Sequence, residues 1–479
     1  MGLVTPVDPV PLSSLGKVHF IAIGGAGMSG IARIMLSRGV TVSGSDSADS
    51  PLLGELSAAG ATVHVGHDEA NLAGADTVVI SSAIRPDNPE LVAARERGLR
   101  VLHRSAALAS VMLDRQGIAV TGTHGKTTTT SMITTILRQA GADPSYVIGG
   151  ILAETGLGAA DGSGPQFVVE ADESDGSFLN LAPAAAVVTS VEADHLDNYG
   201  TLEAIERTFG QFAGRLPAAG LLVACADAPG ALALTRQVGP GVRTVTYGFA
   251  AGSDYVVSDF EQRGMSSRFT VTGGPGTALA GAGPLLVQIA VPGRHFALNA
   301  TAALCVTAEL GVDPSVAVAG LAAYRGARRR MELKGEADGV QVVDSYAHHP
   351  TELAADLAAA RDIVAGGRLI AVFQPHLFSR TRLFAAEFGT ALATADEVIV
   401  MDIYAAREDP EPGITGELIA RAVPGGLAQF RPDRESVPVA AAGLAKPGDM
   451  ILTMGAGDVT ALGPLIVSAL AERAGDGPR

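Results

Sequence analysis

Hydrophobic and polar positions alternate in a regular way along most of the chain. An apolar run at 17–23 precedes a helical pattern at 29–38. Further strand-like runs follow, with helical patterns between them: 40–42, 61–65, 76–81 and 99–102 for the strands, 50–59 and 88–97 for the helices. Strands that alternate with helices form parallel sheets covered by helices. We therefore predict a doubly wound, Rossmann-like α/β domain over residues 1–112.

The same alternation predicts two more α/β domains. Strand-like runs begin again at Ile118 and recur at 167–170, 185–189, 221–224 and 243–247. Residues 254–292 alternate like β-hairpins and predict a small antiparallel sheet, and a helix at 297–310 closes this central domain, 113–322. The last domain, 323–479, is again Rossmann-like, with a helix at 350–364 and strands at 340–343, 369–373, 397–401 and 450–454.

Composition narrows the class of protein. The 479 residues carry a net charge of −16, which argues against nucleic-acid binding. Hydrophobic residues make up 47% and charged residues 18%, but no apolar run is long enough to span a membrane. Residues 1–16 do not resemble a secretory signal, and the two cysteines, Cys225 and Cys305, lie in apolar runs. We expect a cytoplasmic protein with free thiols.

A glycine-bearing loop with a lysine follows the strand at 118–120. Residues 122–128 read G-T-H-G-K-T-T, and a helical pattern comes next. Backbone N–H groups in such a loop attract phosphate oxygens, a lysine reaches the terminal phosphates and a hydroxyl holds Mg²⁺. Only four of the 34 basic residues are lysine, so Lys126 indicates a need for a compact point charge. The spacing departs from the usual motif, because Val120 stands where its first glycine is expected.

A second nucleotide motif lies at the first strand. Residues 25–30 read G-A-G-M-S-G, and Asp46 follows Gly25 by 21 residues at the end of the next strand. Glycines let the backbone approach a pyrophosphate, and the acidic residue binds a ribose hydroxyl. The motif fits an NAD-dependent oxidoreductase, but it also fits a UDP-sugar, which has the same pyrophosphate and ribose.

Other chemistry-bearing residues also follow predicted strands. Glu170 ends the run at 167–170 and is placed to hold Mg²⁺, and His195 follows the next strand beside Asp194 and Asp197. His295 and Asn299 precede or begin a helix, and three arginines lie at 328–330. The segments D-S-Y-A-H-H-P and F-Q-P-H-L-F-S-R-T-R, at 344–350 and 373–382, indicate a pocket for a small anion.

Taken together, these motifs resemble the Mur ligases, the ATP-dependent amide-forming enzymes of peptidoglycan synthesis. The resemblance covers nearly the whole chain and includes M-G-A-G-D at 454–458; the phosphate loop of this family lacks the early glycine too. It implies that the first domain binds a UDP-sugar, the central one ATP, and the third the amino acid. The implied substrates are UDP-N-acetylmuramate, L-alanine and ATP, with Mg²⁺ as cofactor. The implied reaction passes through an acyl phosphate.

The resemblance also implies roles for individual residues. Lys126, Glu170, His195 and Arg380 would be catalytic, and Thr127, Glu170 and His195 would bind metal. The ATP-binding residues would be Gly122, Thr123, His124, Gly125, Lys126, Thr127, Thr128, His295, Asn299, Arg329 and Asp344. Those for the UDP-sugar would be Gly25, Ala26, Gly27, Met28, Ser29, Asp46, His67, Ser82 and Ile84. Tyr346, His348 and Arg380 would line the amino-acid site, and the protein would be a monomer or dimer.

Four positions depart from the family pattern. Ser345 and Ala347 replace Asp and Gly, Phe296 replaces Asn, and Leu377 stands where a basic residue is usual. Leu377 leaves open how the alanine carboxylate is held, so Arg380, with help from Arg382, would have a larger part. Three alternatives stay open from the sequence: a murein tripeptide ligase, an NAD-dependent oxidoreductase and a UDP-sugar sensor without activity.

Overall fold

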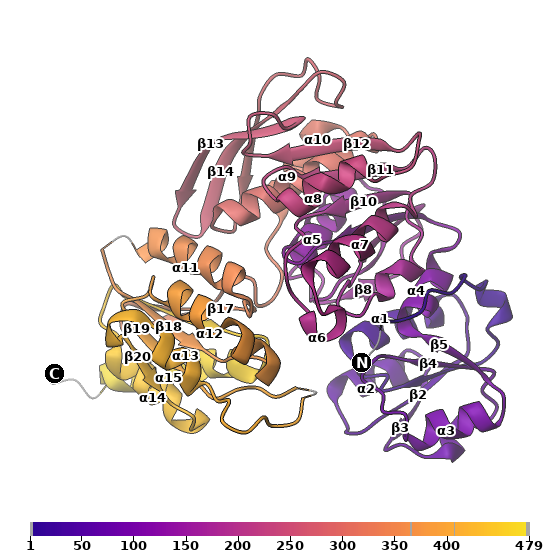
Figure 1. Ribbon diagram of the computed structural model, residues 1–479, viewed down its shortest axis with the longest axis horizontal. Coiled ribbons are helices and arrows are strands. Elements are labelled where there is room, and N and C mark those ends of the chain that lie inside the picture. Colours follow the sequence, from indigo (N-terminus) through magenta and orange to yellow (C-terminus); the bar gives the residue numbers. More distant parts are fainter. Residues whose placement is uncertain (1–2, 365, 407, 476–479) are drawn as a thin grey trace. The chain divides into compact units, whose positions relative to one another are not determined.

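The computed structural model describes residues 3–364, 366–406 and 408–475. The chain divides into two compact units. The first comprises 1–258, 270–287 and 298–324, and the second comprises 259–269, 288–297 and 325–479. Across the described ranges, the strands form three sheets (Figure 1). No helix in these ranges is both long and apolar enough to cross a membrane.

The N-terminal sheet has five parallel strands in the order β3-β2-β1-β4-β5. The strands are β1 Val18–Ile21, β2 Val42–Asp46, β3 Thr62–Val65, β4 Thr77–Ile80 and β5 Arg100–His103. The helices are α1 Ala26–Ser37, α2 Pro51–Ala58, α3 Pro89–Glu96 and α4 Arg104–Met112. The predicted Rossmann-like arrangement is confirmed, and because all five strands are parallel, their carboxyl ends form one edge.

The central sheet has ten strands in the order β15-β14-β13-β12-β11-β10-β6-β9-β7-β8. Its strands are β6 Gln116–Thr121, β7 Ser145–Val147, β8 Ala159–Ala160, β9 Gln166–Glu170, β10 Ala185–Val188, β11 Leu221–Cys225, β12 Arg243–Gly248, β13 Tyr255–Arg263, β14 Ser266–Gly273 and β15 Leu285–Ile289. Its helices are α5 Lys126–Gln139, α6 Leu196–Tyr199, α7 Leu202–Ala213, α8 Pro229–Ala233, α9 Arg294–Glu309 and α10 Pro314–Ala323.

The hairpin strands predicted at 254–292 are present, but they extend the central sheet instead of forming a sheet of their own. β13 pairs in parallel with β12, where Tyr247 lies opposite Tyr255 and Gly248 opposite Val256. The alternating pattern predicted the strands correctly. The pattern could not predict which strand β13 pairs with, because a strand's neighbour is decided by tertiary packing and not by the local sequence.

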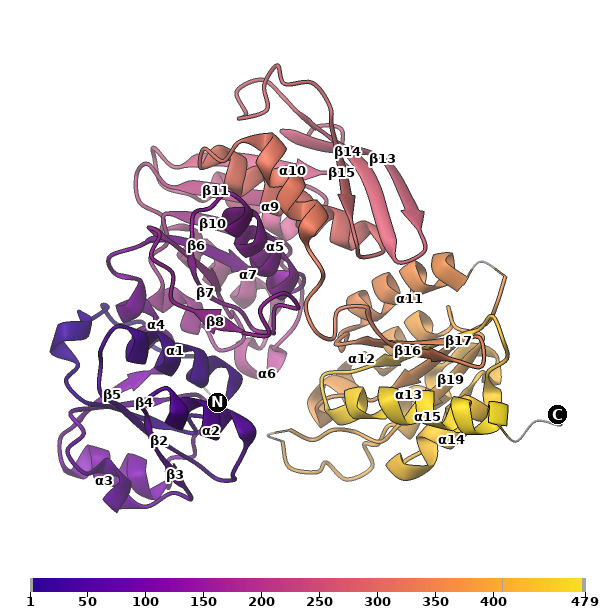
Figure 2. The ribbon, with the colours of Figure 1, turned by 180° about the vertical axis from the view of Figure 1, so that it is seen from behind.

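The C-terminal sheet has six strands in the order β16-β17-β21-β18-β19-β20. The strands are β16 Glu332–Ala337, β17 Val340–Ser345, β18 Leu369–Phe373, β19 Glu397–Val400, β20 Ala428–Phe430 and β21 Met450–Met454. The helices are α11 Pro350–Val364, α12 Phe378–Leu392, α13 Glu417–Ala422, α14 Val437–Leu444 and α15 Leu462–Gly475. β16 is antiparallel to β17, and α11 and α15 cover opposite faces of the sheet (Figure 2).

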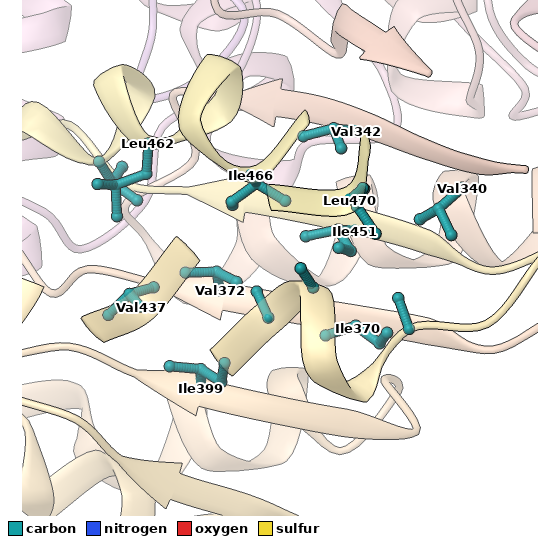
Figure 3. Packing of buried hydrophobic residues seen from close by; sticks show 14 of the residues in the cluster. Val340, Val342, Ile370, Val372, Ile399, Val437, Ile451, Leu462, Ile466 and Leu470 are labelled. Carbon is teal, nitrogen blue, oxygen red and sulfur yellow. The ribbon is translucent and has the colours of Figure 1, made fainter. Parts of the chain in front are cut away.

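Buried aliphatic side chains hold α14 and α15 against the C-terminal sheet. Leu462, Ile466 and Leu470 of α15 pack with Val342 and Ile451 of the strands (Figure 3). All five side chains are fully buried. Full burial of one such side chain contributes about 1.5–3 kcal/mol. This packing makes the sheet a rigid base for the residues at its carboxyl edge.

Candidate active site

The glycine motif begins after β1 and continues into α1, and the loop before it is held by Asp46. The Asp46 carboxylate accepts a hydrogen bond from the Gly24 N–H at 2.9 Å. The N–H of Gly25 bonds the carbonyl of Ala22, and α1 begins at Ala26, while Met28 and Ser29 are buried. The structure thus places the end of β2 against the loop after β1. This leaves the other Asp46 oxygen, Oδ1, near Ser47 at 3.4 Å.

The other residues expected near the UDP-sugar have different surroundings. His67 follows β3 and lies beside Asp46, because the Gly66 N–H donates to the Asp46 carbonyl at 2.7 Å. Ser82 donates its hydroxyl hydrogen to Asp175 at 2.5 Å and lies 3.1 Å from Nε2 of His103. Ile84 packs against the hydrophobic cluster of the N-terminal sheet. His67 is therefore at the expected edge, with its Nδ1 3.0 Å from Glu90, whereas Ser82 and Ile84 contact Asp175 and the hydrophobic cluster.

The phosphate loop brings Lys126 to the carboxyl edge of the central sheet. Its ammonium donates to the carbonyl of Gly122 at 2.6 Å, to that of Thr123 at 3.2 Å and to Glu173 at 2.8 Å. Burial opposes the charge, but the carboxylates of Glu173 and Asp172 raise the pKa of Lys126. Lys126 is therefore a charged group at neutral pH.

Two glycines give this loop its form. Gly122 has φ of +131°, and a Cβ there would lie 2.2 Å from Oγ1 of Thr189. Gly125 has φ of +80°, and a Cβ there would lie 2.5 Å from Oδ1 of Asn299. Both positions therefore require glycine. Asn299, one of the residues that the resemblance implies for ATP, packs against the phosphate loop.

The rest of the loop is held by β10 and the segment after it. The His124 N–H donates to Ser190 at 3.0 Å, and Thr123 Oγ1 accepts from the Glu192 N–H at 2.8 Å. Thr128 is buried in the first turn of α5. Backbone N–H groups at the start of a helix attract anions. The loop is thus fixed before any ligand binds.

Thr127 and Glu170 lie side by side, as the sequence predicted for a metal site. The Thr127 hydroxyl donates to Oε1 of Glu170 at 3.2 Å, and the Gly149 N–H donates to Oε2 at 2.7 Å. A Cβ on Gly149 would lie 2.4 Å from Oε1, so this approach needs a glycine. A hydroxyl and a carboxylate are the hard oxygen ligands that suit Mg²⁺. The donor set fits that ion.

His195 lies close to the carboxylates of Glu173 and Asp194. Its Nε2 is 3.8 Å from Glu173 and 3.6 Å from Asp194. The residue has φ of +51°, an unfavourable conformation for a non-glycine residue. Among the described residues, its buried Nδ1 finds no hydrogen-bond partner. His195 thus has one ring nitrogen near Glu173 and Asp194 and another without a hydrogen-bond partner among the described residues.

Sequence reasoning missed Arg104, which lies between the glycine motif and Asp172 in the segment after β9. Its guanidinium donates to Asp172 at 2.8 Å, and a Cβ on Gly27 would lie 3.3 Å from its Nη1. Burial alone would raise the pKa of Asp172, but the nearby charges, chiefly those of Arg104 and Lys126, together have the larger effect and lower it. The carboxylate is therefore charged. The place of Arg104 just after β5 was the available signal, since α4 was not predicted.

In the second unit, Asp344 is fully buried and has partners for both oxygens. It accepts hydrogen bonds from Thr453 and Thr460, each at 2.7 Å. The guanidinium of Arg329 lies 3.5 Å away and also donates to the carbonyl of Gly455. The contacts with ATP that the resemblance implies for Asp344 and Arg329 would both require these bonds to change.

His295 also has a partner in the second unit. Its Nε2 lies 3.1 Å from Asp356, whose other oxygen accepts a hydrogen bond from the Ser345 hydroxyl. Asp356 lies on α11 and was missed, because its place in a helical pattern gave no sign of a polar contact. The Ser345 hydroxyl also accepts from the Ala347 N–H at 3.0 Å, so Ser345 and Asp356 together shape the loop after β17.

The residues expected at the amino-acid site gather in the second unit. The rings of Tyr346 and His348 lie 5.3 Å apart, and His348 lies 6.0 Å from His376. Nη1 of Arg380 lies 3.5 Å from Nδ1 of His376, and Arg380 is buried. Two residues that we had not selected, His376 and Arg330, belong to this group; the Arg330 guanidinium lies 5.0 Å from the Tyr346 ring.

Leu377 has an unfavourable backbone conformation in this group, with φ of 71°. Its side chain is buried, and its N–H donates to the carbonyl of Tyr404 at 3.1 Å. Non-glycine residues with positive φ cost about 1–3 kcal/mol and are concentrated at functional sites. Leu377 offers no charge, whereas Arg380, in the first turn of α12, is a cation close to it in sequence. Arg382 instead pairs with Glu411 at 3.1 Å.

Three family profiles match the chain in sequence order. They are the Mur ligase family catalytic domain at 17–116, the Mur ligase middle domain at 120–307 and the Mur ligase glutamate ligase domain at 329–457. Together they cover most of the 479 residues. The chain belongs to the Mur ligase family, and its fold has the three α/β domains of that family.

Curated relatives are similar over nearly the full length. One from Thermobifida fusca is 55% identical and covers 98% of this chain and 100% of its own. One from Kineococcus radiotolerans is 56% identical and covers 96% and 98%. Both are called UDP-N-acetylmuramate–L-alanine ligase.

Solved structures of Mur ligases have a fold similar to that of this chain. A UDP-N-acetylmuramate-alanine ligase from Thermotoga maritima is 28% identical, with a TM-score of 0.78 over 96% of this chain and 100% of its own. A murein peptide ligase from Psychrobacter arcticus is 27% identical, with a TM-score of 0.70 over 95% and 99%. Because the chain belongs to the Mur ligase family, the glycine motif is not evidence for an NAD-dependent oxidoreductase.

Proposed function

We propose that this protein is an ATP-dependent ligase that joins L-alanine to the carboxylate of UDP-N-acetylmuramate in peptidoglycan precursor synthesis. The observation that carries the proposal is the placement of Lys126 and Thr127 against Glu173 and Glu170 at one edge of the central sheet. Such a site holds a triphosphate and its metal ion. The 55% identity to a curated alanine ligase supports the choice of substrates.

The chemistry explains why such an enzyme needs ATP. A carboxylate does not react with an amine at neutral pH, because its oxygen is a poor leaving group. The muramate carboxylate oxygen attacks the γ-phosphorus, ADP leaves, and an acyl phosphate forms. The neutral amine of alanine then attacks the acyl carbon, and the tetrahedral intermediate collapses to amide, phosphate and a proton. Lys126 would stabilise the charge that develops on the phosphoryl oxygens.

Mg²⁺ belongs to the proposal, with Thr127, Glu170 and His195 as its protein contacts. The ion supplies charge neutralisation to the phosphates when it is bound. Thr127 and Glu170 offer oxygen atoms that are 3.2 Å apart, and His195 offers a nitrogen that has no hydrogen-bond partner in the part of the chain that the structure describes. Because Mg²⁺ prefers oxygen, His195 would contact it through water or would bind phosphate directly.

The second unit would supply the amino-acid site. Tyr346, His348 and Arg380 would line it, with the Arg380 guanidinium pairing with the alanine carboxylate. His295, Arg329 and Asp344 would contact ATP after their present contacts change. The domain boundaries at 112/113 and 322/323, a cytoplasmic location and a monomeric or dimeric state are further parts of this proposal.

Phosphate release from ATP tests the proposal directly. With Mg²⁺ and UDP-N-acetylmuramate present, we expect release only when L-alanine is added. A parallel reaction keeps Mg²⁺ and UDP-N-acetylmuramate and replaces L-alanine with the tripeptide L-alanyl-γ-D-glutamyl-meso-diaminopimelate. Release with the tripeptide but not with alanine would reassign the protein as a murein peptide ligase. No release in any reaction would favour the binding-protein alternative.

Asp46→Ala is expected to raise KM for UDP-N-acetylmuramate by about tenfold or more, with KM for ATP unchanged. The reason is that Asp46 both fixes the glycine loop through Gly24 and offers an oxygen to ribose. Steady-state kinetics with each substrate varied in turn measures the effect. Asp46→Asn keeps an acceptor for Gly24 and should cost less. An equal rise in both KM values would show that this domain does not hold the UDP-sugar.

A further inference from the structure

Glu90 is a fully buried carboxylate in the first turn of α3, and the proposed reaction gives it no role. Its Oε2 accepts hydrogen bonds from the Ser45 hydroxyl at 2.6 Å and from Nδ1 of His67 at 3.0 Å. Its Oε1 accepts from the Asn71 amide at 2.7 Å and lies 3.6 Å from Nε2 of His19. A buried carboxylate with this many donors is ionised, because each donor stabilises the charge.

The charge of Glu90 decides where the proton of His67 lies. Burial alone would raise the pKa of Glu90, but contacts with His19, Ser45 and Asn71 lower it to about 2. An ionised carboxylate only accepts hydrogen bonds, so Nδ1 of His67 must carry hydrogen. The neutral imidazole then has a lone pair on Nε2. Within the described part of the chain, Nε2 of His67 makes no hydrogen bond, and the side chain is 21% exposed.

The order of the strands places His67 where a nucleobase would lie. The glycine loop follows β1, Asp46 ends β2, and His67 follows β3 by two residues. These strands are neighbours in the order β3-β2-β1, and strands lie about 4.8 Å apart. If the pyrophosphate lies on the glycine loop and the ribose at Asp46, the base continues in the same direction to His67.

We infer that Glu90 is a positioning residue that makes the site selective for uracil, by holding His67 in the tautomer whose Nε2 accepts a hydrogen bond. Uracil has an N3–H that donates to this lone pair. Cytosine has an unprotonated N3 at the same place, so two lone pairs would face each other. The inference rests on the proposed function, because that function supplies the UDP-sugar. It adds which side chain recognises the base of that nucleotide.

Glu90→Gln tests this tautomer control with little change of shape. The Asn71 amide also donates to the Gly66 carbonyl at 3.2 Å, which fixes its orientation. A glutamine must therefore turn its oxygen to Asn71 and its NH₂ group to His67. Nδ1 of His67 then accepts a hydrogen bond, and the ring proton moves to Nε2. The variant would present a donor where the natural protein presents an acceptor.

Calorimetric titration with UDP-N-acetylmuramate and with its cytidine analogue, near pH 8.5 and without ATP, measures the selectivity. We expect the natural protein to prefer uridine by about tenfold or more, and Glu90→Gln to reduce that preference to about threefold or less. Because a donor suits cytosine N3, the affinity for the cytidine analogue should hold or rise. A purely structural role for Glu90 would weaken both ligands equally, and that result would overturn the inference.

His67→Ala is the second variant, since the His67 side chain is partly exposed and lies outside the hydrophobic cluster of the N-terminal sheet. It should remove the preference, and Glu90→Gln added to it should change the preference no further. A preference that persists in His67→Ala would contradict the inference. Nitrogen NMR of labelled histidine gives an independent readout, with the proton on Nδ1 of His67 in the natural protein and on Nε2 in Glu90→Gln.

The failure of this inference is distinguishable from failure of the proposed function. Alanine-dependent phosphate release by the natural protein tests the function, whereas the binding preference does not depend on turnover. Turnover with no uracil preference would overturn only the inference. Uracil preference without turnover would overturn only the function. Absence of binding to either nucleotide sugar would overturn both.

Discussion

Lys126→Ala is expected to lower alanine-dependent phosphate release by a factor of about 10³ or more. The ammonium lies at the phosphate loop, where it donates hydrogen bonds to the carbonyls of Gly122 and Thr123 and to the Glu173 carboxylate. Removing it takes away both the positioning of the phosphates and the stabilisation of charge in the transition state. Initial rates at saturating substrates measure the effect.

Several controls separate catalysis from folding in this variant. Loss of Lys126 leaves Glu173 buried without its cation, so the melting temperature should be measured beside the rate. Lys446→Ala removes an exposed lysine and should leave the rate unchanged. Lys126→Arg keeps the charge, but its planar group does not fit between the two carbonyls, so the rate should stay low. Near-normal turnover by a folded Lys126→Ala protein would contradict the assignment of ATP to this loop.

Glu170→Gln is expected to lower the rate by about 10²–10³ at low Mg²⁺, with partial recovery as Mg²⁺ is raised. The amide has the shape of the carboxylate and still accepts from Thr127 or Gly149, but it lacks the negative charge that holds a divalent cation. Rates measured across a range of Mg²⁺ concentrations give the result. Mn²⁺ binding followed by electron paramagnetic resonance reports on the site without turnover.

A matched substitution tests whether the effect is local to Glu170. Glu206 is an exposed carboxylate on α7, and Glu206→Gln should leave both the rate and its Mg²⁺ dependence unchanged. If Glu170→Gln instead keeps the Mg²⁺ dependence of the natural protein, Glu170 is not a metal contact. The pairing of Thr127 with Glu170 would then serve only to fix the start of α5.

The amino-acid sequence was enough to predict each nucleotide motif and the edge of the sheet where it lies. Lys126 and Thr127 follow β6, Glu170 ends β9 and His195 follows β10, and these strands are neighbours. A local pattern could predict this, because an apolar run defines a strand and the carboxyl ends of parallel strands share one edge. The helix predicted at 350–364 was confirmed for the same reason.

Only the tertiary structure decided which of these side chains have partners. Arg104 and Asp172 are 68 residues apart, and Ser45 and Glu90 are 45 apart, yet each pair is joined by a hydrogen bond. The burial of Asp344 and the extension of the central sheet by β13 also depend on distant segments. The sequence by itself determined the elements and motifs, because they arise from neighbouring residues. Strand order and packing determined the contacts, because these join residues that no local pattern relates.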